Sequence, residues 1–209
     1  MDFKNFLQQF GKSMRSRNLK KRRYPLPESS ALPMEFFRLC PWEAEYLFTV
    51  ARRAKRGILE TGRFNGGSCF LMSCAAPEVP IYSIDIAPQN DDLLRSLFKQ
   101  AGVGANVALI TGDSQRTKYP QVKPVDLLFV DGDHSYEGCH ADITNWYDTL
   151  LPGGHLMLHD CYLGQPGVQD AVLDFLRDHK EMETVLPPYV GLASWQFPAG
   201  SMTHFIKRA

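Results

Sequence analysis

Five short apolar runs that alternate with helical segments constrain the fold of this chain more than any other feature. The clearest run is VDLLFVDG, whose almost continuous apolar character is typical of a strand buried on both faces. The predicted strands are residues 57–62, 81–86, 106–113, 125–132 and 155–160. Helical patterns fall at residues 41–56, from a glycine-rich loop to about 76, and at 91–101, 137–150 and 167–179. This alternation predicts an α/β fold, a mostly parallel sheet with helices on both faces.

The end of the chain has a different pattern. Two further strands are predicted at about residues 184–196 and 202–208, joined by the turn-forming sequence PAGS. Because a short turn joins antiparallel strands, we expect this pair to form a hairpin at one edge of the sheet.

The N-terminal 33 residues are predicted to be a basic arm and a linker, which leaves residues 34–209 as the main domain. Residues 1–23 contain eight Lys or Arg and one acid, Asp2, so this segment carries a net charge of +7 and the remainder −7. Apolar residues at helical steps, from Phe3 to Met14, predict a weak helix. The three prolines of YPLPESSALP, residues 24–33, favour an extended linker.

The charge of the arm permits contact with nucleic acid or an anionic membrane surface. It also fits a solvated arm, a cover over a pocket, or a helix that packs on a partner subunit of a homo-oligomer. No nucleic-acid-binding module is recognisable, and the phenylalanines favour packing against protein, so nucleic acid is disfavoured as a partner. Five cysteines without a CxxC spacing, no visible signal peptide and no apolar stretch of membrane-spanning length predict a cytoplasmic protein with reduced thiols.

Ligands of such folds gather beyond the carboxyl ends of the strands, and polar residues follow several of them here. The first strand ends in ETGRFNGGS, with Glu60, Gly62, Gly66 and Ser68. Glycines at this point let the backbone turn tightly and approach a ligand, although the same residues suit a plain strand-to-helix loop. The G-x-G-x-x-G spacing of nicotinamide-binding loops is missing, which disfavours a dehydrogenase.

Later strand ends also carry polar side chains. Asp85 ends the second strand and suits the two hydroxyls of a ribose, or a helix N-cap. Asp113 and Ser114 follow the third and suit a nucleobase edge, or a cap for the next turn. Asp131 ends the fourth, and His134 follows it in DGDHSY, where Asp-Gly alone could simply reverse the chain.

In this order ETGRFNGGS, YSIDI, GDS, DGDHSYEG and LLPGGHLMLHD resemble a class I S-adenosylmethionine-dependent methyltransferase, over about residues 40–209. The resemblance is to a small O-methyltransferase group that includes enzymes acting on macrolide sugars. It implies a Rossmann-like fold with a seven-stranded, mostly parallel sheet whose last strand is antiparallel. It also implies S-adenosylmethionine as cofactor and a small molecule as methyl acceptor. The cofactor-binding residues it implies are Glu60, Gly62, Gly66, Ser68, Asp85, Asp113, Ser114 and Asp131.

The same resemblance implies catalytic roles for Asp131 and His134, with the imidazole as general base. Asp131 and Asp160, at two neighbouring strand ends, would be the ligands of a hard cation such as Mg²⁺. The group has two adjacent oxygen ligands at the second of these ends, whereas this chain reads His159-Asp160-Cys161. Because thiolate suits Mg²⁺ badly, the sequence leaves the metal open.

The leading hypothesis is therefore methyl transfer from S-adenosylmethionine to a hydroxyl oxygen of a small molecule, with or without a metal. One alternative is a protein of the same fold with other chemistry, such as hydroxylation, since sheets of this kind host several reactions. Another is a cofactor-binding protein without catalysis.

Overall fold

The computed structural model describes residues 1–10, 36–162, 165–188 and 200–209. The rest of the basic arm and the linker at residues 24–33 lie outside the described residues. Within the described ranges, no helix has the length and apolar character to cross a membrane.

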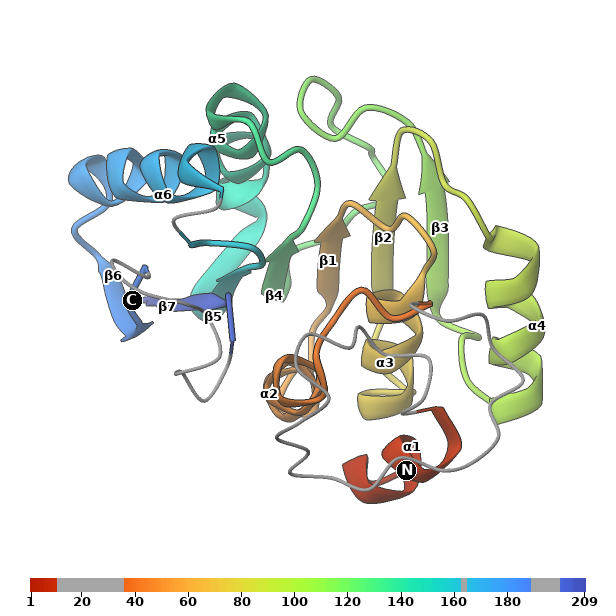
Figure 1. Cartoon of the computed structure of the whole chain (residues 1–209). Helices are drawn as coiled ribbons and strands as arrows, with labels where there is room; N and C mark the ends of the chain where they lie inside the picture. The colour runs from red at the N-terminus through yellow and green to blue at the C-terminus, as the bar shows by residue number, and fades with distance from the viewer. Residues whose placement is uncertain (11–35, 163–164, 189–199) are drawn as a thin grey trace.

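One seven-stranded sheet, in the order β3-β2-β1-β4-β5-β7-β6, forms the centre of the molecule (Figure 1). Every strand pair is parallel except those that involve β7, which runs antiparallel to both β5 and β6. The predicted α/β class, the antiparallel last strand and the edge hairpin are thus confirmed. The strands are β1 (Ile58–Thr61), β2 (Ile81–Asp85), β3 (Val107–Thr111), β4 (Val125–Val130), β5 (Leu150–Leu158), β6 (Met182–Leu186) and β7 (Thr203–Lys207).

Helices cover both faces of the sheet. One face packs against α1 (Phe3–Phe10), α2 (Pro41–Ala51), α3 (Gly67–Ala75) and α4 (Asp91–Ala101), and the other against α5 (Tyr136–Trp146) and α6 (Pro166–Asp178). Successive residues of β4 alternate between the two cores: Leu127 and Phe129 face the first group, Leu128 and Val130 the second. All four are buried, which explains the unbroken apolar run in the sequence.

Several element boundaries differ from the prediction. Helix α2 ends at Ala51 rather than 56, and β5 begins at Leu150, five residues before its predicted start. Leu150 pairs with Val125, and the register of β5 then shifts at an irregularity around Gly153, whose φ is +78°. Between Leu150 and His155 β5 advances five residues while β4 advances two, so the Pro-Gly-Gly sequence forms an irregularity within the strand and does not end it. Strand β6 ends at Leu186, and much of its predicted extension lies outside the described residues.

The first helix is part of the core. Phe6 is fully buried, and its ring lies 5.4 Å from that of Phe37, 6.0 Å from that of Phe48 and 6.1 Å from that of Phe70. Phe3 and Phe6 therefore pack against the chain's own α2 and α3.

Candidate active site

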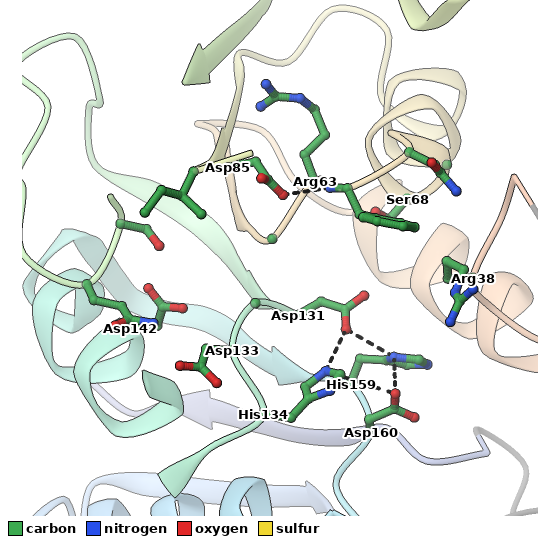
Figure 2. A pocket seen from close by; sticks show the side chains of 18 of the residues that line it. Arg38, Arg63, Ser68, Asp85, Asp131, Asp133, His134, Asp142, His159 and Asp160 are labelled. Atoms are coloured by element: carbon green, nitrogen blue, oxygen red, sulfur yellow. Dashed lines mark hydrogen bonds and ion pairs between the residues drawn. The ribbon is translucent and has the colours of Figure 1, made fainter. Parts of the chain in front are cut away.

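A cavity of about 780 Å³ opens at the carboxyl ends of β1, β2, β3, β4 and β5. This is the edge at which parallel sheets of this kind place ligands. Every segment that the sequence singled out contributes to its lining: the glycine loop, Asp85, the Asp113–Ser114 turn, the Asp131–His134 corner and Asp160 (Figure 2). Of the predicted residues, Glu60 and Gly66 are not among those that line it.

The glycine loop brings its backbone against the β4 corner. Gly62 has φ +87°, and a Cβ atom there would lie 2.1 Å from the carbonyl oxygen of Asp131. Only glycine fits both the conformation and the space. Gly66 also has a positive φ, at the N-cap of α3, and a Cβ there would clash with Leu94. The start of α3, with Gly67 and Ser68, lines the cavity, so its N–H groups are near any bound anion.

Glu60 holds the end of this loop through its side chain. Its carboxyl group is fully buried and accepts hydrogen bonds from the hydroxyls of Ser68 and Ser83. Burial raises the pKa of Glu60 to about 7, although both hydroxyls act to lower it. Glu60 thus joins the start of α3 to β2.

Asp85 occupies the end of β2 as predicted. Its Oδ2 accepts a hydrogen bond from the N–H of Phe64 at 2.7 Å, and its Oδ1 one from the N–H of Ala87 at 2.6 Å. The carboxylate thereby ties the glycine loop to β2 while it still lines the cavity. Beside it, the side chain of Ile86 is 71% exposed at the cavity rim, which offers an apolar surface to a flat ring.

The next turn is held by backbone hydrogen bonds. Asp113 accepts from the N–H groups of Gln115 and Arg116, at 2.9 and 3.2 Å. The carbonyl oxygen of Ser114 accepts from the side chains of Asn145 and Trp146 on α5, at 2.7 and 2.9 Å. Asp113 and Ser114 line the cavity, and α5 fixes their position.

The β4 corner and the end of β5 bring Asp131, His134 and Asp160 together (Figure 2). Nε2 of His134 lies 3.6 Å from Oδ1 of Asp131 and 4.0 Å from Oδ2 of Asp160. This nitrogen is buried and makes no hydrogen bond, while about a third of the side chain is exposed. Asp131 raises the pKa of His134 above its ordinary value, and burial opposes that effect only in part.

His159 lies between two carboxylates of this site. Its ring is buried between Asp131, with Nδ1 3.1 Å from Oδ1, and Glu43 of α2, with Nε2 3.3 Å from Oε2. Burial alone would lower the pKa of His159, but these two carboxylates outweigh it and raise the pKa well above 6.5. The pKa of Glu43 is correspondingly lowered to about 2, because the imidazolium and three hydrogen bonds outweigh its burial.

The comparisons with known proteins agree with this geometry. Residues 59–161 match a family model described as a methyltransferase domain. Just under half of the chain therefore resembles a methyltransferase domain.

Two curated relatives and one solved structure are similar to this chain. An uncharacterised protein of Acanthamoeba polyphaga mimivirus is 30% identical over 134 residues, 57% of this chain and 59% of that protein. The 23S rRNA (uracil(747)-C(5))-methyltransferase RlmC of Vibrio cholerae is 26% identical over 132 residues, 62% of this chain but 34% of that protein. The matches thus span well under two thirds of either relative.

The O-methyltransferase TomG of Streptomyces achromogenes, solved in complex with S-adenosylmethionine, superimposes with a TM-score of 0.62 at 20% identity. The match covers 88% of this chain and 84% of that one. At this identity the match shows that the two chains share a fold.

The cavity fits S-adenosylmethionine, the cofactor that the resemblance to a methyltransferase domain implies. Gly62 lines the cavity without a side chain, Asp85 offers acceptors beside it, and Ile86 is exposed where a base would stack. Six Asp but only three Arg belong to the described lining, which suits a ligand with a positive sulfonium.

The donor set fits Mg²⁺ poorly. Within the described residues, no group of three or more His, Cys, Asp or Glu is placed to hold a metal ion. Oδ1 of Asp131 faces two imidazoles, and the imidazolium of His159 already supplies positive charge beside Asp160, at 3.7 Å. Cys161 is buried and is not among the residues that line the cavity. Both predicted ligands, Asp131 and Asp160, lie beside the imidazoles of His134 and His159.

Sequence analysis did not single out three charged side chains in or beside the cavity. Glu43 reaches His159 from α2, and Asp142 lines the cavity from α5. The guanidinium of Arg63 is fully buried and donates to both oxygens of Asp91, at 2.9 and 3.0 Å, and to the carbonyl oxygen of Ile110. The sequence did hold a signal for Arg63, which is a charged residue inside the glycine-rich loop ETGRFNGGS. A cation that is buried there needs a carboxylate partner. The two acids have no signal in the linear sequence.

Proposed function

We propose that this chain transfers the methyl group of S-adenosylmethionine to a hydroxyl oxygen of a small molecule. A C–O bond forms as the methyl–sulfur bond breaks, the hydroxyl proton goes to His134, and S-adenosylhomocysteine leaves. The observation that carries the proposal is the position of His134, which lies beside Asp131 in the same cavity as the glycine loop and Asp85.

Different residues of the chain bind the cofactor and accept the proton. The loop from Gly62 to Ser68 and Asp85 hold the cofactor, whose sulfonium supplies the methyl group. His134 takes the proton, and Asp131 orients its ring and stabilises the imidazolium that forms. General-base catalysis of this kind contributes roughly 10²–10⁴-fold, and alignment of the two reactants contributes the rest.

The proposal favours a small-molecule acceptor over RNA, despite the similarity to RlmC. A polyphosphate backbone needs clustered Lys and Arg, whereas the described lining contains six Asp and three Arg. A small acceptor meets no such repulsion.

Turnover tests this function. The chain is incubated with labelled S-adenosylmethionine and a panel of hydroxyl-bearing small molecules, beside structured RNA. We expect S-adenosylhomocysteine to form with at least one small molecule and label to appear as an O-methyl ether. Cofactor binding without turnover on any acceptor would favour a non-catalytic binding protein, and an oxidised product would favour other chemistry on this fold.

A further inference from the structure

Arg38 lines the cavity from the segment that precedes α2, and this segment is fixed on two sides. The preceding residue, Phe37, is fully buried, whereas Arg38 is exposed. Gly67 at the start of α3 allows the segment to approach closely, since a Cβ atom there would lie 2.8 Å from the Cα of Phe37. On the other side, the N–H of Cys40 donates to Oε2 of Glu43 at 2.7 Å. The guanidinium therefore projects from a backbone that is already in place before a ligand binds.

Arg38 lies at the end of the cavity that holds His134, the reactive end of the proposed methyl transfer. Glu43, which fixes the segment of Arg38, also contacts the ring of His159 at 3.3 Å, so the segment lies near the end of β5. Figure 2 shows Arg38 on the side of the cavity that holds His134 and His159. Its Cζ lies 5.8 Å from the centre of the Phe64 ring, which also belongs to the lining. This cation–π contact holds the side chain beside the cavity.

The other two arginines of the described lining serve other contacts. The guanidinium of Arg63 is fully buried and donates to both carboxylate oxygens of Asp91. Arg116 follows β3, which lies at the opposite end of the cavity from β5 in the sheet order, and its Nε lies 4.0 Å from Asp113. Within the described lining, Arg38 is thus the arginine that a ligand at the reactive end meets.

The charges at the reactive end permit a ligand with one negative charge. Asp131 and Asp160 lie there, but carboxylates raise the pKa of His159 well above 6.5, so its imidazolium offsets one of them. Arg38 offsets the other. A guanidinium binds a carboxylate through two parallel N–H groups. A phosphate, with nearly two negative charges at pH 7, would meet stronger repulsion from the six Asp of the described lining.

The cofactor's own carboxylate has a different partner. Gly67 and Ser68 line the cavity at the start of α3, a helix of nine residues, and the first N–H groups of a helix favour an anion. This position belongs to the glycine loop, which is proposed to hold the cofactor. A carboxylate at Arg38 would then belong to the second ligand of the cavity, the methyl acceptor.

We propose that the acceptor is a hydroxy acid, and that Arg38 binds its carboxylate while its hydroxyl faces His134. The inference rests on the proposed function and names the class of small molecule that is methylated. Phe36 and Leu39 of the same segment also line the cavity and offer apolar contacts to the body of such an acid. Arg38 contacts the substrate away from the reacting atoms, so it determines specificity and takes no part in proton transfer.

Turnover on matched pairs of acceptors tests the inference. The pairs are 3-hydroxybenzoate, 4-hydroxybenzoate and mandelate, each beside its uncharged amide. Wild type should methylate at least one acid with a kcat/KM at least tenfold above that of its amide, because two charge-assisted hydrogen bonds are gained. Arg38→Met should raise the KM for that acid at least tenfold, with kcat, the KM for the amide and the affinity for S-adenosylhomocysteine little changed. Arg38→Lys, which keeps the charge, should recover part of the loss.

Arg116→Met is the matched control, because it removes the same charge from the other end of the cavity and should leave the preference for the acid intact. Equal losses for acid and amide in Arg38→Met would mean that Arg38 only supports its segment, and would overturn the inference. At least tenfold weaker S-adenosylhomocysteine binding by that variant, measured by calorimetry, would assign the guanidinium to the cofactor's carboxylate and overturn it as well.

The wild-type result separates this inference from the proposed function. Methylation of amides or other uncharged hydroxyl compounds, at rates equal to or above those of the acids, would overturn the inference and leave the proposed function intact. If no hydroxyl compound of either kind is methylated, the proposed function fails and this inference fails with it.

Discussion

Nδ1 of His159 lies 3.1 Å from Oδ1 of Asp131, while Nε2 of the same ring faces a second carboxylate, that of Glu43, at 3.3 Å. All three groups are largely removed from water, so each charge depends on the others. Truncation of one partner of such a buried pair leaves an uncompensated charge, which typically costs about 3–5 kcal/mol.

His159→Leu should therefore lower the free energy of unfolding by about 3–5 kcal/mol, measured by urea denaturation at pH 7. The double variant His159→Leu/Glu43→Leu should recover part of this loss. In the single variant the carboxylate of Glu43, beside Ser201, is left without its imidazolium partner, and the second substitution removes that carboxylate. Strict additivity of the two single effects would contradict the coupling.

Asp85→Ala should weaken S-adenosylmethionine binding by roughly tenfold or more, because a charge-assisted hydrogen-bond acceptor is lost. The same carboxylate holds the N–H of Phe64, so Asp85→Asn is the matched control that retains an acceptor. Calorimetry that gives wild-type affinity for the Ala variant would rule out the ribose assignment.

His134→Ala should lower turnover by about 10²–10⁴-fold and leave the cofactor dissociation constant nearly unchanged. The neutral ring is the base, and Asp131 raises its pKa above 6.5, so wild-type turnover should fall as the pH drops through that raised value. In Asp131→Asn the fall should move to lower pH, in line with the lost carboxylate. If Asp131→Asn left the pH profile unchanged, Asp131 would not be the group that raises the pKa of His134.

Chelators should leave turnover unchanged, because the imidazolium of His159 provides the positive charge between the carboxylates. Thermal unfolding with and without millimolar Mg²⁺ gives a second measurement, in which the midpoint should stay constant. A midpoint that rises with Mg²⁺, together with inhibition by a chelator that added Mg²⁺ reverses, would restore the metal to the site.

Phe6→Ala should cost about 3–5 kcal/mol of stability, since a fully buried ring is removed from contact with three others. Cofactor affinity measured below the unfolding temperature should not change, because none of the described side chains of α1 lines the cavity. Exposed Lys4→Ala on the same helix is the control for surface effects. If deletion of residues 1–23 instead abolished tight, salt-sensitive RNA binding, the arm would be a nucleic-acid contact.

Sequence reasoning located the site wherever a residue's place depends on the strand that precedes it. Asp85, Asp131 and Asp160 lie at the ends of parallel strands, and parallel strands end at one edge, so their meeting follows from topology. Asp142 and Glu43 come from helices, and which turn of a helix reaches a cavity depends on tertiary packing that one sequence does not reveal. The start of β5 was misjudged for a related reason: Pro-Gly-Gly favours a turn locally, but pairing with β4 overrides that preference.

The contact between Glu43 and Ser201 joins the second helix to the residues just before β7, which enters the sheet between β5 and β6. During synthesis the strands that hold the cofactor emerge first, and a chain that folds from its N-terminus can assemble β1 to β4 early. The hydrogen bonds from Ser201 to Glu43 cannot form until the residues before β7 have been synthesised. A nascent chain would thus form its cofactor pocket before Ser201 fixes the carboxylate that pairs with His159.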